Sequence, residues 1–330
     1  RSHFHGHVGL LGTDEPFAPW FFGPANPTLG SPDLTNSDVI AFADARDAFV
    51  SYMHPIVGDE GPFAGDEVGY IPLELVSDAL LAERLGLELV CAWTSPLGTA
   101  ELWYRLLNVG KAVPAMSGTD AWVDFHRTPA MGTARNYVRV AADDVSADTV
   151  RNAAIAGRGF VTTAPALVFS VGDGARPGDV VAAGRQPWRA TLASTTAVDT
   201  VELLVNGVVV ERRDGVAANA RRDFTGEVDL PDGGWVAVRA YASERPDDAW
   251  PSMHVRPFAH TSPVWIGAVG STDPAARGKA AAELLRAIDD AAVRAREAYG
   301  NVATPKLDAR FEAARAVLRP FIAAVPTGAP

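Results

Sequence analysis

The sequence predicts an α/β protein in three parts, and three observations support that prediction. In the first half, short apolar runs alternate with segments in which apolar residues recur at helical spacing. From residue 166 to about residue 270, short alternating runs separated by turn residues replace the helical spacing. The remainder is rich in alanine, with apolar residues three and four apart, as in amphipathic helices. We therefore expect an α/β domain at 1–165, an antiparallel β-sandwich at 166–270 and a helical segment at 271–330.

The first part is expected to consist of strands that alternate with helices. The predicted strands are 49–53, 87–93 and 111–116, and the predicted helices are 75–85 and 100–109. This β-α-β-α-β order predicts parallel strands with the helices packed outside them. Two long loops rich in Gly, Pro and acidic residues, 13–36 and 56–72, interrupt the order. Loops of that length in a compact domain usually cover a binding site.

Turn and helix signals define the other two parts. Two valine-rich runs flank Asn206 and Gly207, and Asn-Gly between such runs is a strong hairpin signal. Further along, the apolar residues of 274–299 and 307–321 fall on one side of each predicted helix. We expect these two faces to pack against the body of the protein; a coiled coil or a partner helix is the alternative.

The composition restricts the partners. The formal net charge is −11, and no stretch rich in Lys and Arg offsets it, which argues against a nucleic-acid partner and against an anionic membrane. No apolar run approaches the roughly 20 residues that span a bilayer. We expect a soluble protein, cytoplasmic or secreted, that acts on a small-molecule substrate. Cys91 stands in an apolar run and has no second cysteine to pair with, so we expect a buried thiol.

Side chains of the metal-ligand type stand where two predicted strands end. His54 follows the first strand, and Asp120 follows the third, with Ser-Gly-Thr before it. In barrels of alternating strands and helices, these strand ends hold metals and substrates. Imidazole nitrogen and carboxylate oxygen are ligands for Zn, Mn and Fe. The ordinary alternatives are a satisfied core histidine at His54 and an Asx-turn at Asp120.

Three more histidines stand at the start of the chain. If residues 3–7 are extended, His3, His5 and His7 project from one face, because side chains alternate along a strand. Three imidazoles on one face favour a metal site. A solvated terminus with chance histidines, or the remains of an affinity tag, is the alternative.

Taken together, these segments resemble the polymerase and histidinol phosphatase (PHP) superfamily of metallohydrolases, and best its carbaryl-hydrolase-like branch. The metal motifs match at Gly-His (6–7), His-Pro (54–55) and Gly-Thr-Asp-Ala (118–121). The full set of matching segments is 6–12, 53–55, 103–110, 118–121, 156–165, 205–207 and 260–263. They extend over nearly the whole chain, so the match is specific although each short motif alone is not.

The resemblance implies a distorted β/α barrel whose strand ends bind two or three divalent metal ions (Zn, Mn or Fe). His7, His54 and Asp120 fall on metal-ligand positions of that pattern. His5 has no assured counterpart and is a candidate for an extra ligand only.

The chain departs from the family pattern at two places. The family's opening His-x-His strand and an acidic ligand would lie upstream of Arg1, so we expect 1–165 to be a partial barrel that lacks its N-terminal part. The family's Asp-Ala-His ending reads Asp-Ala-Trp here, with Trp122 in place of the second ligand.

The implied activity is hydrolysis of an ester, amide or carbamate bond by metal-activated water. His126 is a candidate for charge stabilisation or protonation of the leaving group, and Arg135 for substrate orientation; a plain loop histidine is the ordinary reading of His126. One alternative is a catalytically inactive PHP-like binding or structural protein, which the absent ligands favour. Another is a phosphoesterase of the same superfamily, which the lack of a Lys/Arg cluster disfavours.

Overall fold

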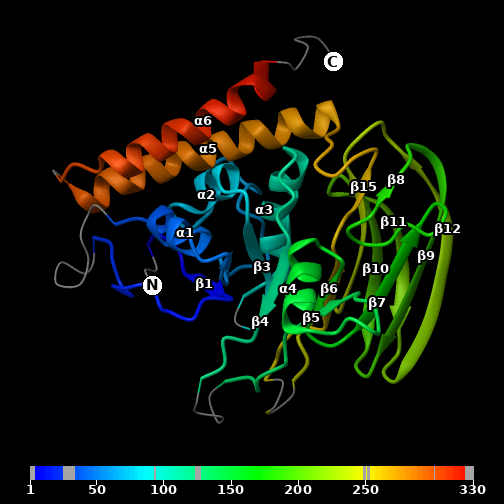
Figure 1. The fold of residues 1–330 in the computed structure, drawn as a ribbon. Helices are drawn as coiled ribbons and strands as arrows, with labels where there is room; N and C mark the ends of the chain where they lie inside the picture. The colour runs from blue at the N-terminus through cyan, green and yellow to red at the C-terminus, as the bar shows by residue number, and fades with distance from the viewer. Residues whose placement is uncertain are drawn as a thin grey trace. The chain divides into compact units, whose positions relative to one another are not determined.

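A computed structural model describes most of the chain, and Figure 1 shows its fold. The described residues are 4–24, 34–92, 94–122, 128–247, 250, 253–300 and 302–323. The chain divides into two compact units. The first unit comprises Arg1–Leu87, Leu97–Val113 and Pro274–Pro330, and the second comprises Glu88–Pro96 and Pro114–Asp273. The α/β class expected from the sequence is confirmed, and the described strands form no closed barrel.

The apolar spacing of the sequence predicts six of the eight described elements of the first unit. Its elements are β1 (Val8–Leu11), α1 (Asn36–Asp44), β2 (Phe49–Tyr52), α2 (Leu75–Leu81), the start of β3 (Leu85–Cys91), α3 (Pro96–Asn108), α5 (Pro274–Tyr299) and α6 (Pro305–Ala323). β2 and β3 are parallel, as the order of strands and helices predicts. β1 is antiparallel to β2, so the strand at the start of the chain does not continue the parallel pattern. Cys91 is buried at the end of β3, as expected.

The two C-terminal helices lie side by side in the first unit (Figure 1). α5 has the bounds predicted from the sequence, and its expected apolar face is buried, from Leu284 and Ile288 to Tyr299. On α6, Leu307, Phe311 and Leu318 are buried as well. The prediction that these faces pack against the body of the protein is therefore confirmed. Among the described helices, none has both the length and the apolar character needed to cross a membrane.

The second unit is rich in antiparallel strands. Its elements after β3 are β4 (Ala115–Gly118), β5 (Arg135–Val138), α4 (Ala147–Ile155), β6 (Gly159–Thr162), β7 (Ala166–Val171), β8 (Val180–Val181), β9 (Gly184–Ser194), β10 (Val198–Val205), β11 (Val208–Val216), β12 (Ala220–Leu230), β13 (Trp235–Tyr241), β14 (Phe258–Thr261) and β15 (Val264–Ile266). The predicted hairpin joins β10 to β11, with Val205 opposite Val208. Asn206 and Gly207 both have positive φ, 51° and 82°, as a two-residue hairpin turn requires.

One hydrophobic core lies inside the second unit and receives side chains from two sheets. The three-stranded sheet β12-β9-β7 contributes Phe224, Leu192 and Phe169. The larger sheet contributes Leu203 from β10 and Val238 from β13. Successive side chains of a strand point to opposite faces of its sheet. Alternate residues of each strand therefore face the shared core, and in these strands those residues are mainly apolar. These strands therefore owe their stability mainly to burial on one face.

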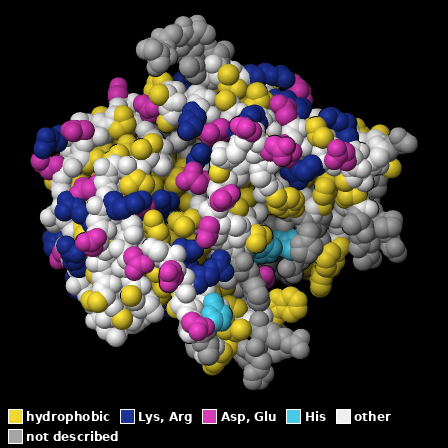
Figure 2. Space-filling view, turned by 180° about the vertical axis from the view of Figure 1, so that it is seen from behind, with side chains coloured by type: hydrophobic (Ala, Val, Ile, Leu, Met, Phe, Trp, Pro, Cys, Tyr) yellow, Lys and Arg dark blue, Asp and Glu magenta, His cyan; other side chains and the backbone are white. Residues whose placement is uncertain are grey.

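Charged side chains of both signs are mixed on the face of the molecule in Figure 2. On the neighbouring strands β9 and β12 of the second unit, Arg185 pairs with Glu227 at 2.6 Å, and Arg189 pairs with Asp223 at 3.1 Å. All four of these side chains are exposed. Exposed pairs of this kind contribute little stability, so they mainly set the surface charge of these two strands.

His260 on β14 gives the second unit a pH dependence. Its side chain is buried, and Nδ1 donates a hydrogen bond to the Thr261 carbonyl oxygen at 2.7 Å. Burial lowers the pKa of His260 from 6.5 to about 3. As the pH falls below about 6.5, His260 becomes protonated in the unfolded chain but stays neutral in the folded chain. The free energy of unfolding therefore falls.

Replacing this side chain with another ring should weaken that dependence. We expect His260→Phe to lose about 2 kcal/mol less stability than the wild type between pH 7 and pH 4.5. Urea unfolding at the two pH values measures the difference, with the exposed His254→Gln as the control. An unchanged pH slope in His260→Phe would show that His260 is not responsible.

Candidate metal centre

His7 and His54 come together because of the antiparallel pairing of β1 and β2. His7 immediately precedes β1, and His54 follows the end of β2 by two residues. Val8 lies opposite Tyr52, so the start of β1 is beside the end of β2. The backbone N–H of Met53 also donates to the His7 carbonyl oxygen at 2.9 Å. Two histidines 47 positions apart in the sequence thus face each other.

The two imidazoles lie within hydrogen-bond distance of each other. His7 Nδ1 lies 3.0 Å from His54 Nε2, and the ring planes meet at 87°. His7 is buried, and His54 is partly exposed with a positive φ of 35°, a region that non-glycine residues seldom occupy. Zn–N bonds of about 2.0–2.1 Å place two tetrahedral ligands roughly 3.3 Å apart. The 3.0 Å spacing of the two nitrogens is that of a hydrogen bond between the rings, and it is also close to the spacing of two ligands of one ion.

The two histidines alone do not form a metal site. Within the described ranges of the chain, no group of three or more His, Cys, Asp or Glu side chains is arranged to hold an ion. Asp120 belongs to the second unit, where it follows β4 and has a positive φ of 49°. Of the predicted ligands, the first unit therefore brings His7 and His54 together, and Asp120 stays a predicted ligand at a strand end.

His5 has a different environment from His7. The extended conformation considered for residues 3–7 is wrong for the described part, because residues 4 and 5 form a turn and β1 begins at Val8. His5 Nδ1 donates to Glu74 Oε1 at 2.5 Å, and Nε2 accepts from the Tyr299 hydroxyl at 2.6 Å. Binding a metal through either nitrogen would break one of these bonds. His3 lies outside the described residues.

Gly6 permits the turn between the two histidines. Its φ is +110°, and a Cβ at this position would lie 2.5 Å from the ring of Tyr52 and 2.8 Å from Pro72. Any larger residue would therefore clash and would also be strained. Gly6 packs against Tyr52 and Pro72, so His5 and His7, although only two residues apart, have different neighbours.

A buried polar network holds the backbone that carries these histidines. The Asn36 side-chain amide donates to the carbonyl oxygens of His5 and Gly6, each at 3.2 Å. The Asn36 backbone N–H donates to Glu74 Oε1 at 2.9 Å. Asn36 and Glu74 are both buried, so water cannot replace these hydrogen bonds if they are broken, and their loss would be costly. The network therefore fixes the position of the segment just before His7.

The network extends to an ion pair between the buried Asp78 on α2 and Arg310 on α6. The Tyr52 hydroxyl accepts from Asn36 Nδ2 at 2.9 Å and donates to Asp78 Oδ2 at 2.7 Å. Arg310 on α6 donates to Asp78 Oδ1 at 2.5 Å. Burial, and next the charge of Glu74, raise the pKa of Asp78 from 3.8 to about 7, against the opposing effects of Arg310 and Tyr52. No local pattern in the sequence marks these polar residues; Asp78, for example, stands within an apolar helical pattern.

The remaining predicted site residues belong to the second unit or lie outside the described part. Arg135 begins β5, is exposed, and donates through Nη2 to the Thr163 carbonyl oxygen at 3.3 Å. Trp122, which replaces the expected second ligand, is 67% exposed. His126 lies outside the described residues. The roles of Arg135 and His126 therefore stay predictions.

Comparison with known proteins adds one distant likeness. No protein-family model matches the chain, and no curated protein matches it. A solved structure that it resembles is the crystal structure of chicken MD-1 complexed with lipid IVa, at 15% sequence identity and a TM-score of 0.15. The match covers 31% of this chain and 87% of that one. At this TM-score the likeness carries no argument about the fold or the ligand.

Proposed function

We propose that the chain is a metal-dependent hydrolase of the PHP superfamily, of the carbaryl-hydrolase-like branch, that cleaves an ester, amide or carbamate bond in a small molecule. The observation that carries the proposal is the 3.0 Å approach of His7 Nδ1 to His54 Nε2. These are two of the three positions at which the family resemblance places metal ligands. A chance pair of core histidines would not be expected to match both.

His7 and His54 are the residues that would hold a divalent ion such as Zn, Mn or Fe; Asp120 stays a candidate ligand on the family resemblance alone. When bound, such an ion lowers the pKa of a coordinated water and polarises the oxygen of the bond to be cleaved. The bonds of Asn36 to the backbone beside His7 would keep that imidazole oriented. His126 and Arg135 keep their proposed roles with the leaving group and the substrate.

The domain organisation that we propose follows the same resemblance. It comprises a barrel-type β/α domain at 1–165, a β-sandwich at 166–270 and a helical segment at 271–330. The parallel pairing of β2 with β3 supports the first domain. The two sheets that share one core in the second unit support the sandwich.

A cavity in the first unit supports an apolar substrate. It has a volume of about 430 Å³, and its lining includes Val8, the residue after His7, but neither His7 nor His54. Phe17, Trp20 and Phe22 line it, and they come from the long loop that the sequence suggested as the cover of a binding site. Asp14 and Glu15 also line it and would repel a phosphate group. This lining favours a neutral ester or carbamate over a phosphoester.

The proposal is tested by measuring hydrolysis after metal-free protein is loaded with Zn, Mn or Fe(II). The substrates are 4-nitrophenyl acetate, the corresponding N-methylcarbamate and 4-nitrophenyl phosphate. We expect metal-dependent cleavage of the ester or carbamate, reduced roughly 100-fold or more in His54→Ala, because a bound metal contributes several kcal/mol. The exposed His254→Ala should match the wild type. Cleavage of the phosphate alone would identify a phosphoesterase, and no cleavage by the metal-loaded protein would favour the binding or structural alternative.

A further inference from the structure

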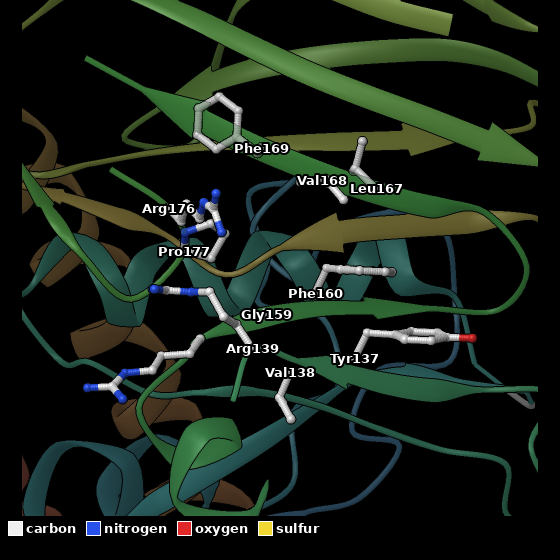
Figure 3. A pocket seen from close by; sticks show the side chains of 11 residues that line it. Tyr137, Val138, Arg139, Gly159, Phe160, Leu167, Val168, Phe169, Arg176 and Pro177 are labelled. Atoms are coloured by element: carbon white, nitrogen blue, oxygen red, sulfur yellow. The ribbon is translucent and has the colours of Figure 1, made fainter. Parts of the chain in front are cut away.

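A second cavity lies entirely within the second unit and has a lining of unusual charge for this protein. Its volume is about 290 Å³, and it lies among β5, β6, β7 and the loop that carries Arg176 (Figure 3). Its eleven lining residues include three arginines, Arg139, Arg158 and Arg176, and neither an aspartate nor a glutamate. The chain as a whole has a net charge of −11. The cavity is therefore a local positive site in an acidic protein.

Asp179 organises the basic end without lining the cavity. It accepts from Arg139 Nη2 at 2.8 Å and from the backbone N–H of Arg176 at 3.0 Å. Burial raises the pKa of Asp179, but these two bonds and the charges of Arg139 and Arg158 outweigh it and hold the pKa below its ordinary value. One carboxylate thus accompanies three arginines, of which Arg139 binds it through the guanidinium and Arg176 through the backbone N–H, and this leaves an excess of positive charge at this end.

The other end of the cavity is apolar. Tyr137 on β5 and Phe160 on β6 are opposite each other in register, and their rings stack with centroids 4.9 Å apart. Leu167 and Phe169 on β7 are buried and add apolar lining to the cavity. Figure 3 shows Arg139 and Arg176 at one end of the cavity and the side chains of Tyr137 and Phe160 at the other. The cavity thus has a basic end and an aromatic end.

We propose that this cavity binds a small organic acid with a carboxylate at one end and a flat apolar group at the other. Guanidinium groups bind carboxylates through paired, charge-assisted hydrogen bonds. The aromatic end offers apolar area and ring faces to the rest of the ligand. Ligand cavities usually measure roughly 300–1,000 Å³, so the volume suits a small molecule. The site involves only second-unit residues and is independent of His7 and His54.

Titration calorimetry with 4-phenylbutyrate tests this proposal, and 4-phenylbutanol serves as the uncharged match. We expect saturable binding of the acid, with the alcohol roughly tenfold or more weaker, because it lacks the charge-assisted bonds. Arg176→Ala and Arg158→Ala should each weaken the acid roughly tenfold and leave the alcohol unchanged. Arg185→Ala removes the same charge from an exposed pair elsewhere in the second unit and should bind as the wild type does.

A further variant tests the apolar end without disturbing the core. Val168 lines the cavity and is 58% exposed, so Val168→Glu should fold normally and should repel the acid. Near-UV circular dichroism checks the fold of each variant. Absence of saturable binding by the wild type, equal binding of acid and alcohol, or equal losses in Arg176→Ala and Arg185→Ala would each overturn the proposal.

Discussion

Replacing Arg310 with alanine should destabilise the protein by about 3–5 kcal/mol at pH 8 and by clearly less at pH 5. Asp78, the partner of Arg310, is completely buried, whereas the Arg310 side chain is 21% exposed. Removing the guanidinium at pH 8 leaves a buried carboxylate beside Glu74 with no cation. Such an uncompensated charge is among the most costly consequences of a single substitution.

The pH dependence follows from the pKa of Asp78, which is raised from 3.8 to about 7. Between these values the folded chain holds a proton that the unfolded chain releases, so this group's contribution to stability falls as the pH rises. At pH 5 the folded-state carboxyl is neutral, and the loss of Arg310 leaves no bare charge. Removing the cation raises the pKa of Asp78 further, so at pH 8 the variant must either bury an unpaired carboxylate or take up a proton, and both cost stability there.

Arg315 provides a matched control for this prediction. It stands on the same helix with the same 21% exposure, but its partners Asp289 and Glu312 are 58% and 55% exposed. Arg315→Ala should cost about 1 kcal/mol or less. Urea unfolding of both variants at pH 5 and pH 8 makes the comparison. Equal losses for Arg310→Ala at the two pH values would show that Asp78 does not titrate as described.

Replacing Glu74 with alanine should cost about 3–5 kcal/mol, because two buried donors lose their acceptor. These donors are His5 Nδ1 and the backbone N–H of Asn36. The effect should be measured at pH 5, below the pKa of Asp78, because removal of the Glu74 charge eases the ionisation of Asp78 at higher pH. The exposed Glu83→Ala, just beyond the end of α2, should change stability by no more than about 0.5 kcal/mol.

The same substitution should also affect the proposed metal centre, because the network holds the backbone before His7. We expect Glu74→Ala to weaken metal binding while Glu83→Ala leaves it unchanged. Thermal unfolding with and without added Zn separates the two effects, since bound metal raises the melting temperature. A full Zn-dependent increase in Glu74→Ala would mean that the network stabilises the fold without positioning His7.

The sequence predicted those elements whose signals are local. The bounds of α5 were predicted because an amphipathic spacing runs between Pro274 and Gly300, which favour the start and the end of a helix. The β10–β11 hairpin was predicted because Asn206 and Gly207 tolerate the positive φ that its turn requires. In both places, the residues that decide the structure are neighbours in the chain.

The features that the sequence did not predict depend on distant residues. The bond between His5 and Tyr299 joins positions 294 apart, and the pair of Arg310 with Asp78 joins positions 232 apart. The antiparallel direction of β1 also has no local signal, although it places His7 beside His54. The two histidines were thus predicted as ligands from motif resemblance, whereas the strand pairing that joins them could not be predicted.

The most direct test of the account is the metal content of the purified chain, measured by plasma mass spectrometry for the wild type, His54→Ala and His254→Ala. His254 is exposed and bonds to the Pro246 carbonyl oxygen, so its removal controls for the loss of one histidine. The account predicts about one or more equivalents of Zn, Mn or Fe in the wild type and His254→Ala, lost in His54→Ala. Metal-free wild-type protein that stays so after dialysis against these ions, although folded, would contradict it.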